Sequence, residues 1–372
     1  MYRNFALLLV LFFSTAIHSM NTIANETDTR TLDYDIALDE DWTSVAQLTL
    51  PAESSDDLPS LVILFHGSGP YDMNATYSEN PFSDEDPLSQ NFLYIAETLA
   101  EQGIATLRFN KRGVITYGEY DQTQIQADLD QLVADANAVV DFALDLESID
   151  TEQIYLYGWS EGAWVIANVA NQRNDLAGLI MQGAPNGSFA ELIPYQYQDI
   201  ALPYFREVID ADGDGLVAPA DIADIPAGPV QLMAPFFIYQ PGSDPANPSA
   251  NAFVDSNSDG LIAIDDELAP AIEMYIGNLP AFMPQTAART DTAELIAEAG
   301  IPTLLLHGDM DGWTAITGAE AIAEANPDLV SLNIYEGLGH ALSETEQLAE
   351  DGFYPMESTP IDDLVTWLAG QR

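Results

Sequence analysis

The segment 158–162 reads Gly-Trp-Ser-Glu-Gly, with a glycine at each end and Ser160 at its centre. It follows an apolar run at 153–157 and precedes small residues at 163–170, a pattern that predicts a strand, a sharp turn and a helix. The glycines permit the turn, which exposes the serine hydroxyl between the strand end and the helix N-terminus. A hydroxyl placed there can act as a nucleophile when a histidine takes its proton and an acid orients that histidine.

Three histidines follow predicted strands and are candidates for the base. His66 and His307 come directly after apolar runs, whereas His340 lies in a glycine-flanked loop after the last predicted strand. A glycine-flanked loop histidine has little reason to fill a core, so we predict His340 as the general base. We expect His307 to be a structural residue bonded to a backbone partner, and His66 to support the turn that follows it.

Two aspartates, Asp309 and Asp311, follow the strand that ends near His307, and either could orient the base. The chain order of Ser160, these aspartates and His340 resembles that of α/β-hydrolases of the serine esterase type. In that family the acid usually stands four residues after the motif histidine. The resemblance therefore implies Asp311 as the acid, with Asp309 as the alternative.

Two further segments carry the resemblance. Residues 66–70 read His-Gly-Ser-Gly-Pro and residues 107–113 read Leu-Arg-Phe-Asn-Lys-Arg-Gly, similar to hydrolases described as esterase-like or lysophospholipase-like. The resemblance implies that the backbone N–H groups of Ser68 and Glu161 stabilise the oxyanion of the reaction. We expect Lys111 and Arg112 to form structural ion pairs, with contact to an anionic substrate as the alternative.

The rest of the chain alternates apolar strands and amphipathic helices, which predicts an α/β fold with a mostly parallel, doubly wound sheet. The resemblance implies an α/β-hydrolase core formed by residues 34–187 and 288–372. Predicted strands lie near 42–50, 61–65, 104–109, 154–157, 176–181, 303–306 and 330–335, and predicted helices near 91–102, 128–146, 293–299, 315–325 and 361–368.

Residues 188–287 break this alternation and are rich in Pro, Asp and Tyr. Because they lie between two core strands, we expect an inserted, mainly helical cap over the carboxyl ends of the strands, where open α/β sheets bind ligands. Such a cap would shape the substrate pocket. We expect Trp159 and Trp313, which flank catalytic positions, to pack in the core rather than line that pocket.

Two twelve-residue segments of the cap, 210–221 and 255–266, fit the calcium loop of EF-hand proteins, with Gly at position 6 and an apolar residue at position 8. Val217 and Ile262, at position 8 of each, are expected to pair. Position 12 is Asp where the standard loop has Glu, which resembles dockerin modules and extracellular calcium-binding proteins. The predicted ligands are Asp210, Asp212, Asp214, Asp221 and the carbonyl of Leu216 in the first loop, and Asp255, Asn257, Asp259, Asp266 and the carbonyl of Leu261 in the second.

We expect two structural calcium ions in these loops and no organic cofactor; a pair of metal-free Asp/Gly-rich turns is the alternative.

The chain has 372 residues, of which 60 are acidic and 9 basic, for a formal net charge of −51. That charge excludes nucleic acid as a partner, because phosphate contacts need Lys and Arg. It is typical of a solvated, soluble surface.

Residues 1–24 have the pattern of a secretory signal, with one Arg before an apolar run too short to span a bilayer. We expect cleavage and a secreted or periplasmic product without stable membrane insertion; an uncleaved anchor is the alternative. There is no cysteine, hence no disulfide. Oligomeric state cannot be predicted from this sequence.

The residues and the resemblance together predict a secreted serine hydrolase that cleaves carboxylic esters through an acyl-enzyme at Ser160. The expected partner is a small-molecule ester. A serine peptidase or amidase acting on a peptide stays open, because the same residues serve both reactions. A non-catalytic, calcium-dependent binding module is the alternative from another class.

Overall fold

The computed structural model describes residues 29–52, 57–78, 87–125, 127–244, 246–282 and 290–371. The predicted signal segment, 1–24, lies outside the described residues. Within those ranges no helix combines the length and the apolar composition needed to cross a bilayer.

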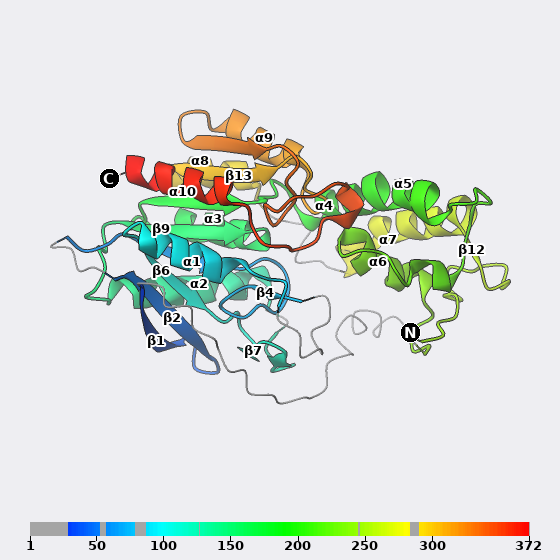
Figure 1. Cartoon of the computed structure of the whole chain (residues 1–372), viewed down its shortest axis with the longest axis horizontal. Coiled ribbons are helices and arrows are strands. Elements are labelled where there is room, and N and C mark those ends of the chain that lie inside the picture. The colour runs from blue at the N-terminus through cyan, green and yellow to red at the C-terminus, as the bar shows by residue number, and fades with distance from the viewer. Residues whose placement is uncertain are drawn as a thin grey trace.

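Eight strands form one sheet in the order β1-β2-β6-β3-β9-β10-β13-β14 (Figure 1). Neighbours from β6 to β14 are parallel, while β1 and β2 form an antiparallel edge. The predicted α/β architecture is therefore confirmed. The strands are β1 (Thr29–Ala37), β2 (Thr43–Pro51), β3 (Leu61–Phe65), β6 (Ala105–Phe109), β9 (Ile154–Trp159), β10 (Gly178–Gln182), β13 (Thr303–Gly308) and β14 (Val330–Tyr335).

Helices cover both faces of this sheet because its central strands are apolar on both sides. In β3, Leu61, Ile63 and Phe65 join one hydrophobic cluster, and Val62 and Leu64 join the other. The first cluster includes residues of α2 (Leu129–Leu144), α3 (Glu161–Gln172), α8 (Thr292–Ala299) and α9 (Ile316–Ala325), and the second includes residues of α1 (Asn91–Glu101) and α10 (Ser358–Gly370).

The first strand begins before the predicted start of the core at residue 34. All nine residues of β1 pair with β2, from Thr29 opposite Pro51 to Ala37 opposite Thr43. Leu32, Tyr34 and Ile36 alternate with more exposed residues and pack against or within the core. The sheet therefore gains an edge strand that the sequence analysis did not include.

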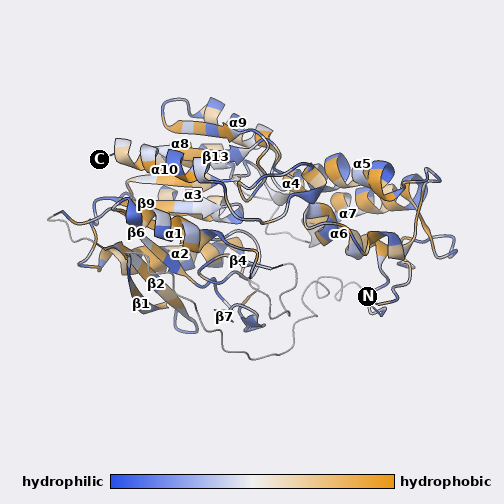
Figure 2. Ribbon diagram, in the orientation of Figure 1, coloured by the Kyte–Doolittle hydropathy of each residue, from blue (hydrophilic) through white to orange (hydrophobic). Residues whose placement is uncertain are grey.

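The segment between β10 and α8 is largely helical and lies to one side of the sheet (Figure 1). It has its own hydrophobic cluster, built from its helices and from the short pair β11 (Leu216–Val217) and β12 (Ile262–Ala263). Figure 2 shows hydrophobic residues along α5, α6 and α7 as well as along the central strands. The helices are α4 (Phe189–Pro194), the π-helices η1 (Tyr195–Ala201), η2 (Phe205–Ile209) and η4 (Ile264–Leu268), α5 (Leu202–Tyr204), the 3-10 helix η3 (Pro219–Ile222), α6 (Pro229–Ile238) and α7 (Ala269–Phe282).

Candidate active site

Ser160 occupies the turn between β9 and α3, as predicted, with φ +56° and ψ −118°. A positive φ is strained for a residue with a side chain and is typical of functional turns. A Cβ added to Gly158 would lie 2.4 Å from the Gly162 carbonyl oxygen, and one on Gly162 would lie 2.4 Å from the Phe65 carbonyl oxygen. Close backbone packing therefore requires glycine at both positions and keeps the serine at the tip of the turn.

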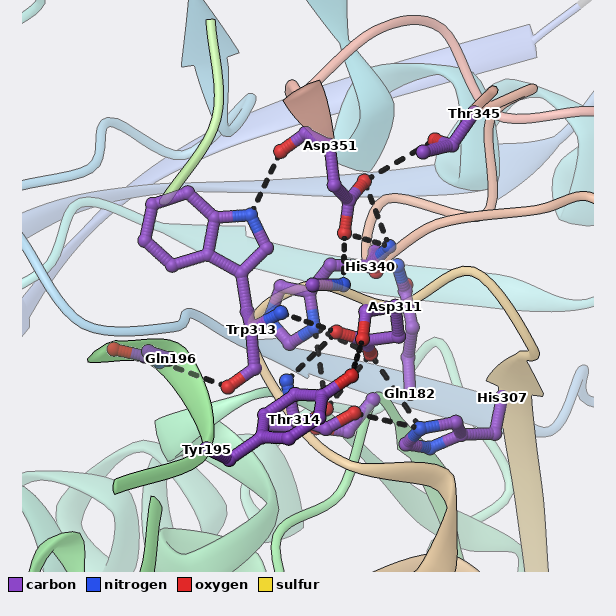
Figure 3. A network of polar contacts seen from close by, with 12 residues as sticks. Gln182, Tyr195, Gln196, His307, Asp311, Trp313, Thr314, His340, Thr345 and Asp351 are labelled. Atoms are coloured by element: carbon purple, nitrogen blue, oxygen red, sulfur yellow. Dashed lines mark hydrogen bonds and ion pairs between the residues drawn. The ribbon is translucent and has the colours of Figure 1, made fainter. Parts of the chain in front are cut away.

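His340 and Asp311 form a buried pair after β14 and β13 (Figure 3). The His340 Nδ1 lies 2.7 Å from Asp311 Oδ2, and each residue is 2% exposed. Asp311 Oδ1 accepts the backbone N–H groups of Trp313 at 2.8 Å and Thr314 at 2.7 Å, and the Thr314 hydroxyl donates to Oδ2 at 2.7 Å. These donors favour the ionised carboxylate.

His340 and Asp311 each shift the pKa of the other toward the charged form. Burial would lower the pKa of His340, but the charge and the hydrogen bond of Asp311 outweigh burial and raise it above its ordinary value. Burial would raise the pKa of Asp311, but the charge and the hydrogen bond of His340 lower it. An imidazole that donates its Nδ1 proton to Asp311 presents Nε2 as a proton acceptor.

The alternative acid, Asp309, lies elsewhere. Its side chain is exposed, and its Oδ1 accepts the backbone N–H of Gly337 at 2.7 Å. Of the two aspartates, Asp311 is therefore the one in contact with the His340 ring.

The other two histidines are buried and bonded to backbone carbonyls, in agreement with the structural roles expected for them. His307 Nε2 lies 3.1 Å from the Thr314 carbonyl oxygen, and burial lowers the pKa of His307. His66 Nε2 lies 2.9 Å from the Asp72 carbonyl oxygen, and burial lowers the pKa of His66 to about 3.

Gln182, at the end of β10, connects the backbone segments of the nucleophile and the base. Its carbonyl accepts the Ser160 N–H at 2.9 Å, and its Nε2 donates to the His340 carbonyl at 2.8 Å. Among the described residues no hydrogen bond joins the Ser160 hydroxyl to the His340 ring; such bonds often tighten only when substrate binds. A Cβ on the adjacent Gly183 would lie 2.6 Å from His340 Nδ1, so glycine there leaves room for the imidazole.

A second buried carboxylate, Asp351, joins the loops that carry the acid and the base (Figure 3). Its Oδ2 accepts the N–H groups of Gly312 at 2.8 Å and His340 at 2.9 Å, and its Oδ1 accepts the Thr345 hydroxyl at 3.3 Å. Burial, followed by the charge of Asp311, raises the pKa of Asp351 to about 7. Neither Asp351 nor Gln182 belongs to a motif, so their roles could not be predicted from the sequence.

The two expected oxyanion donors, Ser68 and Glu161, lie on segments next to Ser160. Glu161 is the first residue of α3, and its N–H adds to the positive end of that helix. The N–H groups of Ser68 and Glu161 donate to no acceptor in the described part of the chain. A Cβ on Gly67 would lie 3.2 Å from the Ser160 Cβ, so the loop that carries Ser68 passes close to the serine.

Lys111 and Arg112 form the ion pairs that the sequence analysis expected. Lys111 Nζ lies 2.7 Å from Glu161 Oε2, and Arg112 binds Asp135 and Asp39 at 2.5 and 2.7 Å. The alternative, contact with an anionic substrate, is not needed to explain their positions.

The segment between β10 and α8 contacts the acid loop directly (Figure 3). The Tyr195 hydroxyl donates to the Asp311 carbonyl at 2.6 Å, and Gln196 Nε2 donates to the Trp313 carbonyl at 2.8 Å. Trp313 stacks on Phe353 with ring centroids 5.0 Å apart. The helical segment therefore holds the backbone next to the acid.

The two acidic loops of this segment lie side by side. Val217 pairs with Ile262 between β11 and β12, so the expected pairing of the two position-8 residues is confirmed. In the first loop, carboxylate oxygens of Asp210, Asp212 and Asp214 lie within 4.8 Å of one another. These oxygens are hard ligands of the kind that calcium prefers.

The second loop differs at its end. Asp266 is exposed, whereas the next residue, Glu267, is buried and accepts the N–H groups of Ser256 at 2.7 Å and Ala263 at 3.0 Å. In the first loop Asp221 accepts the corresponding N–H, that of Ala218, at 2.7 Å. Glu267 therefore takes the place in the second loop that Asp221 has in the first, one residue later.

The fold and this geometry define the class of the protein. A mostly parallel eight-stranded sheet with a strained serine at the turn after a central strand is the α/β-hydrolase fold. The sequence profile of the Prolyl oligopeptidase family matches residues 90–205, which include Ser160. Esterase EstD of Thermotoga maritima is 29% identical over 150 residues, a match that covers 40% of this chain and only 32% of that relative.

Solved structures share the fold over nearly the whole chain. A hypothetical protein of Pseudomonas aeruginosa is 16% identical with a TM-score of 0.51, and the match covers 96% of this chain and 100% of that one. A puromycin-hydrolyzing peptidase of Mycobacterium tuberculosis is 14% identical with a TM-score of 0.50, and the match covers 95% of this chain and 40% of that one. Identities this low establish the fold alone.

Proposed function

We propose that this protein is a serine hydrolase that cleaves carboxylic esters through an acyl-enzyme intermediate at Ser160. The observation that carries the proposal is the buried His340–Asp311 pair, joined at 2.7 Å, on the loops that follow β13 and β14. The strained backbone of Ser160 and the glycines beside it support the assignment of the nucleophile. The identity with Esterase EstD supports an ester as the substrate.

In this mechanism the Ser160 hydroxyl attacks the ester carbonyl carbon while His340 Nε2 takes the hydroxyl proton. The negative oxygen of the tetrahedral intermediate binds the N–H groups of Ser68 and Glu161. When the intermediate collapses, the bond to the alcohol oxygen breaks and that oxygen receives the proton from His340. Water then attacks the acyl group with the same assistance, releasing the acid and restoring Ser160, while Asp311 stays ionised throughout.

A peptide or amide substrate is the second candidate, because the profile of the Prolyl oligopeptidase family matches residues 90–205.

The experiment measures the hydrolysis of p-nitrophenyl esters of increasing chain length and of p-nitroanilides, by the wild type and by Ser160→Ala. Ester turnover that Ser160→Ala abolishes supports the proposal. Turnover of anilides alone makes the protein a peptidase or amidase, and no turnover of either by folded protein refutes the hydrolase assignment.

We further propose that each acidic loop binds one calcium ion with a structural role. The three carboxylates of the first loop and the antiparallel pairing of the two loops support this. Asp210, Asp212, Asp214 and Asp221 would hold the first ion, together with the carbonyl of Leu216. Extracellular loops of this kind bind calcium at about 10⁻⁴–10⁻³ M, in keeping with the export we propose for a chain whose residues 1–24 resemble a signal.

A further inference from the structure

Lys111 is the only lysine of the chain, and it lies between the two segments that flank Ser160. We propose that Lys111 is a positioning residue that orients both N–H donors of the oxyanion site. The inference rests on the proposed function, because the oxyanion forms only if Ser160 attacks a carbonyl. It assigns the chain's one lysine a role in the reaction without contact to the substrate.

The first contact fixes the donor on Ser68. Lys111 Nζ donates to the Gly67 carbonyl oxygen at 2.7 Å. That carbonyl and the Ser68 N–H belong to one planar peptide group, so holding the oxygen sets the direction of the N–H. A hydrogen bond from a charged donor to the carbonyl also polarises the peptide, which makes its N–H a stronger donor.

The second contact acts on the donor from Glu161. Lys111 Nζ lies 2.7 Å from Glu161 Oε2, and the two side chains are 13% and 14% exposed. Glu161 supplies the other N–H, yet its own carboxylate would oppose a developing anion nearby. The ammonium offsets that charge and links the first residue of α3 to the loop that carries Ser68.

The neighbouring cation shows that this arrangement is specific to Lys111. Arg112 points to Asp135 and Asp39, and its ion pairs lie apart from Gly67 and Glu161. Within the described residues Lys111 has no other acidic partner than Glu161. The lysine ammonium is compact, stands on a flexible side chain and carries three N–H donors. It can therefore bind two acceptors on different segments more readily than the planar guanidinium of an arginine.

The test compares Lys111→Met with the wild type in ester turnover and in affinity for an alkyl boronic acid, which adds to a catalytic serine as a tetrahedral anion. We expect kcat and boronate affinity to fall together by about 10-fold to 100-fold, less than the roughly 10²–10³-fold cost of removing an oxyanion donor, because both donors stay in place; KM should change by less than about 2-fold. The control is Arg173→Met. It removes the same charge from ion pairs with Asp141 and Asp175 at the other end of α3, and should leave all three quantities unchanged.

A chemical rescue keeps the test decisive if the methionine variant folds poorly. Because the chain has no cysteine, the variant Lys111→Cys carries a single thiol. Alkylation with 2-bromoethylamine restores an ammonium at nearly the length of lysine, whereas iodoacetamide adds a neutral amide. We expect kcat and boronate affinity to recover with the first reagent alone.

Equal boronate affinity and kcat for wild type and Lys111→Met, or for the two alkylated forms, would overturn the inference while leaving Ser160 as the nucleophile. A wild type that neither turns over esters nor binds the boronate would instead refute the proposed function, and the inference with it.

Discussion

The Asp351 carboxylate accepts the backbone N–H of His340 at 2.9 Å, while the His340 ring contacts Asp311. The same oxygen accepts the N–H of Gly312, the residue after Asp311. One buried carboxylate therefore holds the segments of the acid and of the base at a fixed separation. This contact sets the position of the imidazole without touching its nitrogens.

Replacing Asp351 with asparagine should therefore impair both activity and stability. The new amide directs N–H groups at backbone N–H groups, and each buried donor left unpaired costs about 1–3 kcal/mol. We expect kcat/KM to fall at least about 10-fold, since small displacements of catalytic groups are costly. The measurement is ester kinetics together with urea unfolding.

The control for Asp351→Asn is Asp363→Asn. Asp363, in α10, binds the Tyr335 hydroxyl at 3.0 Å and does not accept the N–H groups of Gly312 and His340, which bind Asp351. This variant should lose some stability at most and keep its kcat/KM. Equal kinetic effects for the two variants would contradict the positioning role of Asp351.

The pH dependence of kcat/KM should report His340. Its imidazole must be neutral to accept the serine proton, so activity rises with pH through an apparent pKa above the ordinary value of 6.5. Asp311→Asn removes the larger of the two carboxylate charges that raise the pKa of His340 and leaves that of Asp351, so the apparent pKa should fall, with a loss in kcat of about 10⁴-fold. Asp309→Asn should leave the profile unchanged; a profile that responds to Asp309 instead would reverse the choice of acid.

The hydroxyl of Tyr195 should support catalysis through the acid loop. Tyr195→Phe removes the hydrogen bond to the Asp311 carbonyl, with a stability cost of about 1 kcal/mol. We expect a several-fold lower kcat. Tyr197→Phe, the same change in the same π-helix where the ring packs on Tyr275, should not lower kcat. If the two variants behave alike, the contact between the helical segment and the acid loop has no catalytic role.

Calcium should stabilise the protein. With a Kd of about 10⁻⁴–10⁻³ M, a calcium concentration of about 10 mM is about 10 to 100 times Kd and adds about 1.4–2.7 kcal/mol per site to the free energy of unfolding. Calcium at that concentration should therefore raise Tm, and a chelator should reverse the shift. Asp210→Asn combined with Asp255→Asn should abolish the response. If calcium does not change the Tm of the wild type, the loops are metal-free turns and the calcium proposal is wrong.

The ligands of the second loop can be separated by a matched pair of variants. Because Glu267 is turned toward the loop and Asp266 is exposed, Glu267→Gln should weaken calcium binding more than Asp266→Asn does. Isothermal titration calorimetry measures both affinities. The opposite order would restore Asp266 as the ligand at position 12.

Features that depend on local pattern could be predicted from the sequence. The turn at Ser160 follows from its two glycines, and the pairing of Val217 with Ile262 follows from a repeated loop pattern. Edge strand β1 was not among the predicted strands and begins before the predicted start of the core at residue 34, although Leu32, Tyr34 and Ile36 alternate as half-buried strands do.

Features that depend on tertiary contacts could not be predicted. Gln182 binds the carbonyl of His340 and Asp351 binds the N–H of Gly312, both outside any local motif, so no sequence pattern marks these contacts. The π-helix η4 begins at Ile264, inside the second acidic loop, and Glu267, one position after Asp266, is the residue that binds the loop backbone. A count of residues from the start of the loop cannot reveal that shift.

The most direct test of the account is covalent labelling of Ser160. A fluorophosphonate probe should label the wild type stoichiometrically, with mass spectrometry placing the adduct on Ser160, and should block turnover of p-nitrophenyl esters. Ser160→Ala should be neither labelled nor active while keeping the wild-type Tm within a few degrees. Labelling at another residue, or ester turnover that survives in Ser160→Ala, would contradict the central claim.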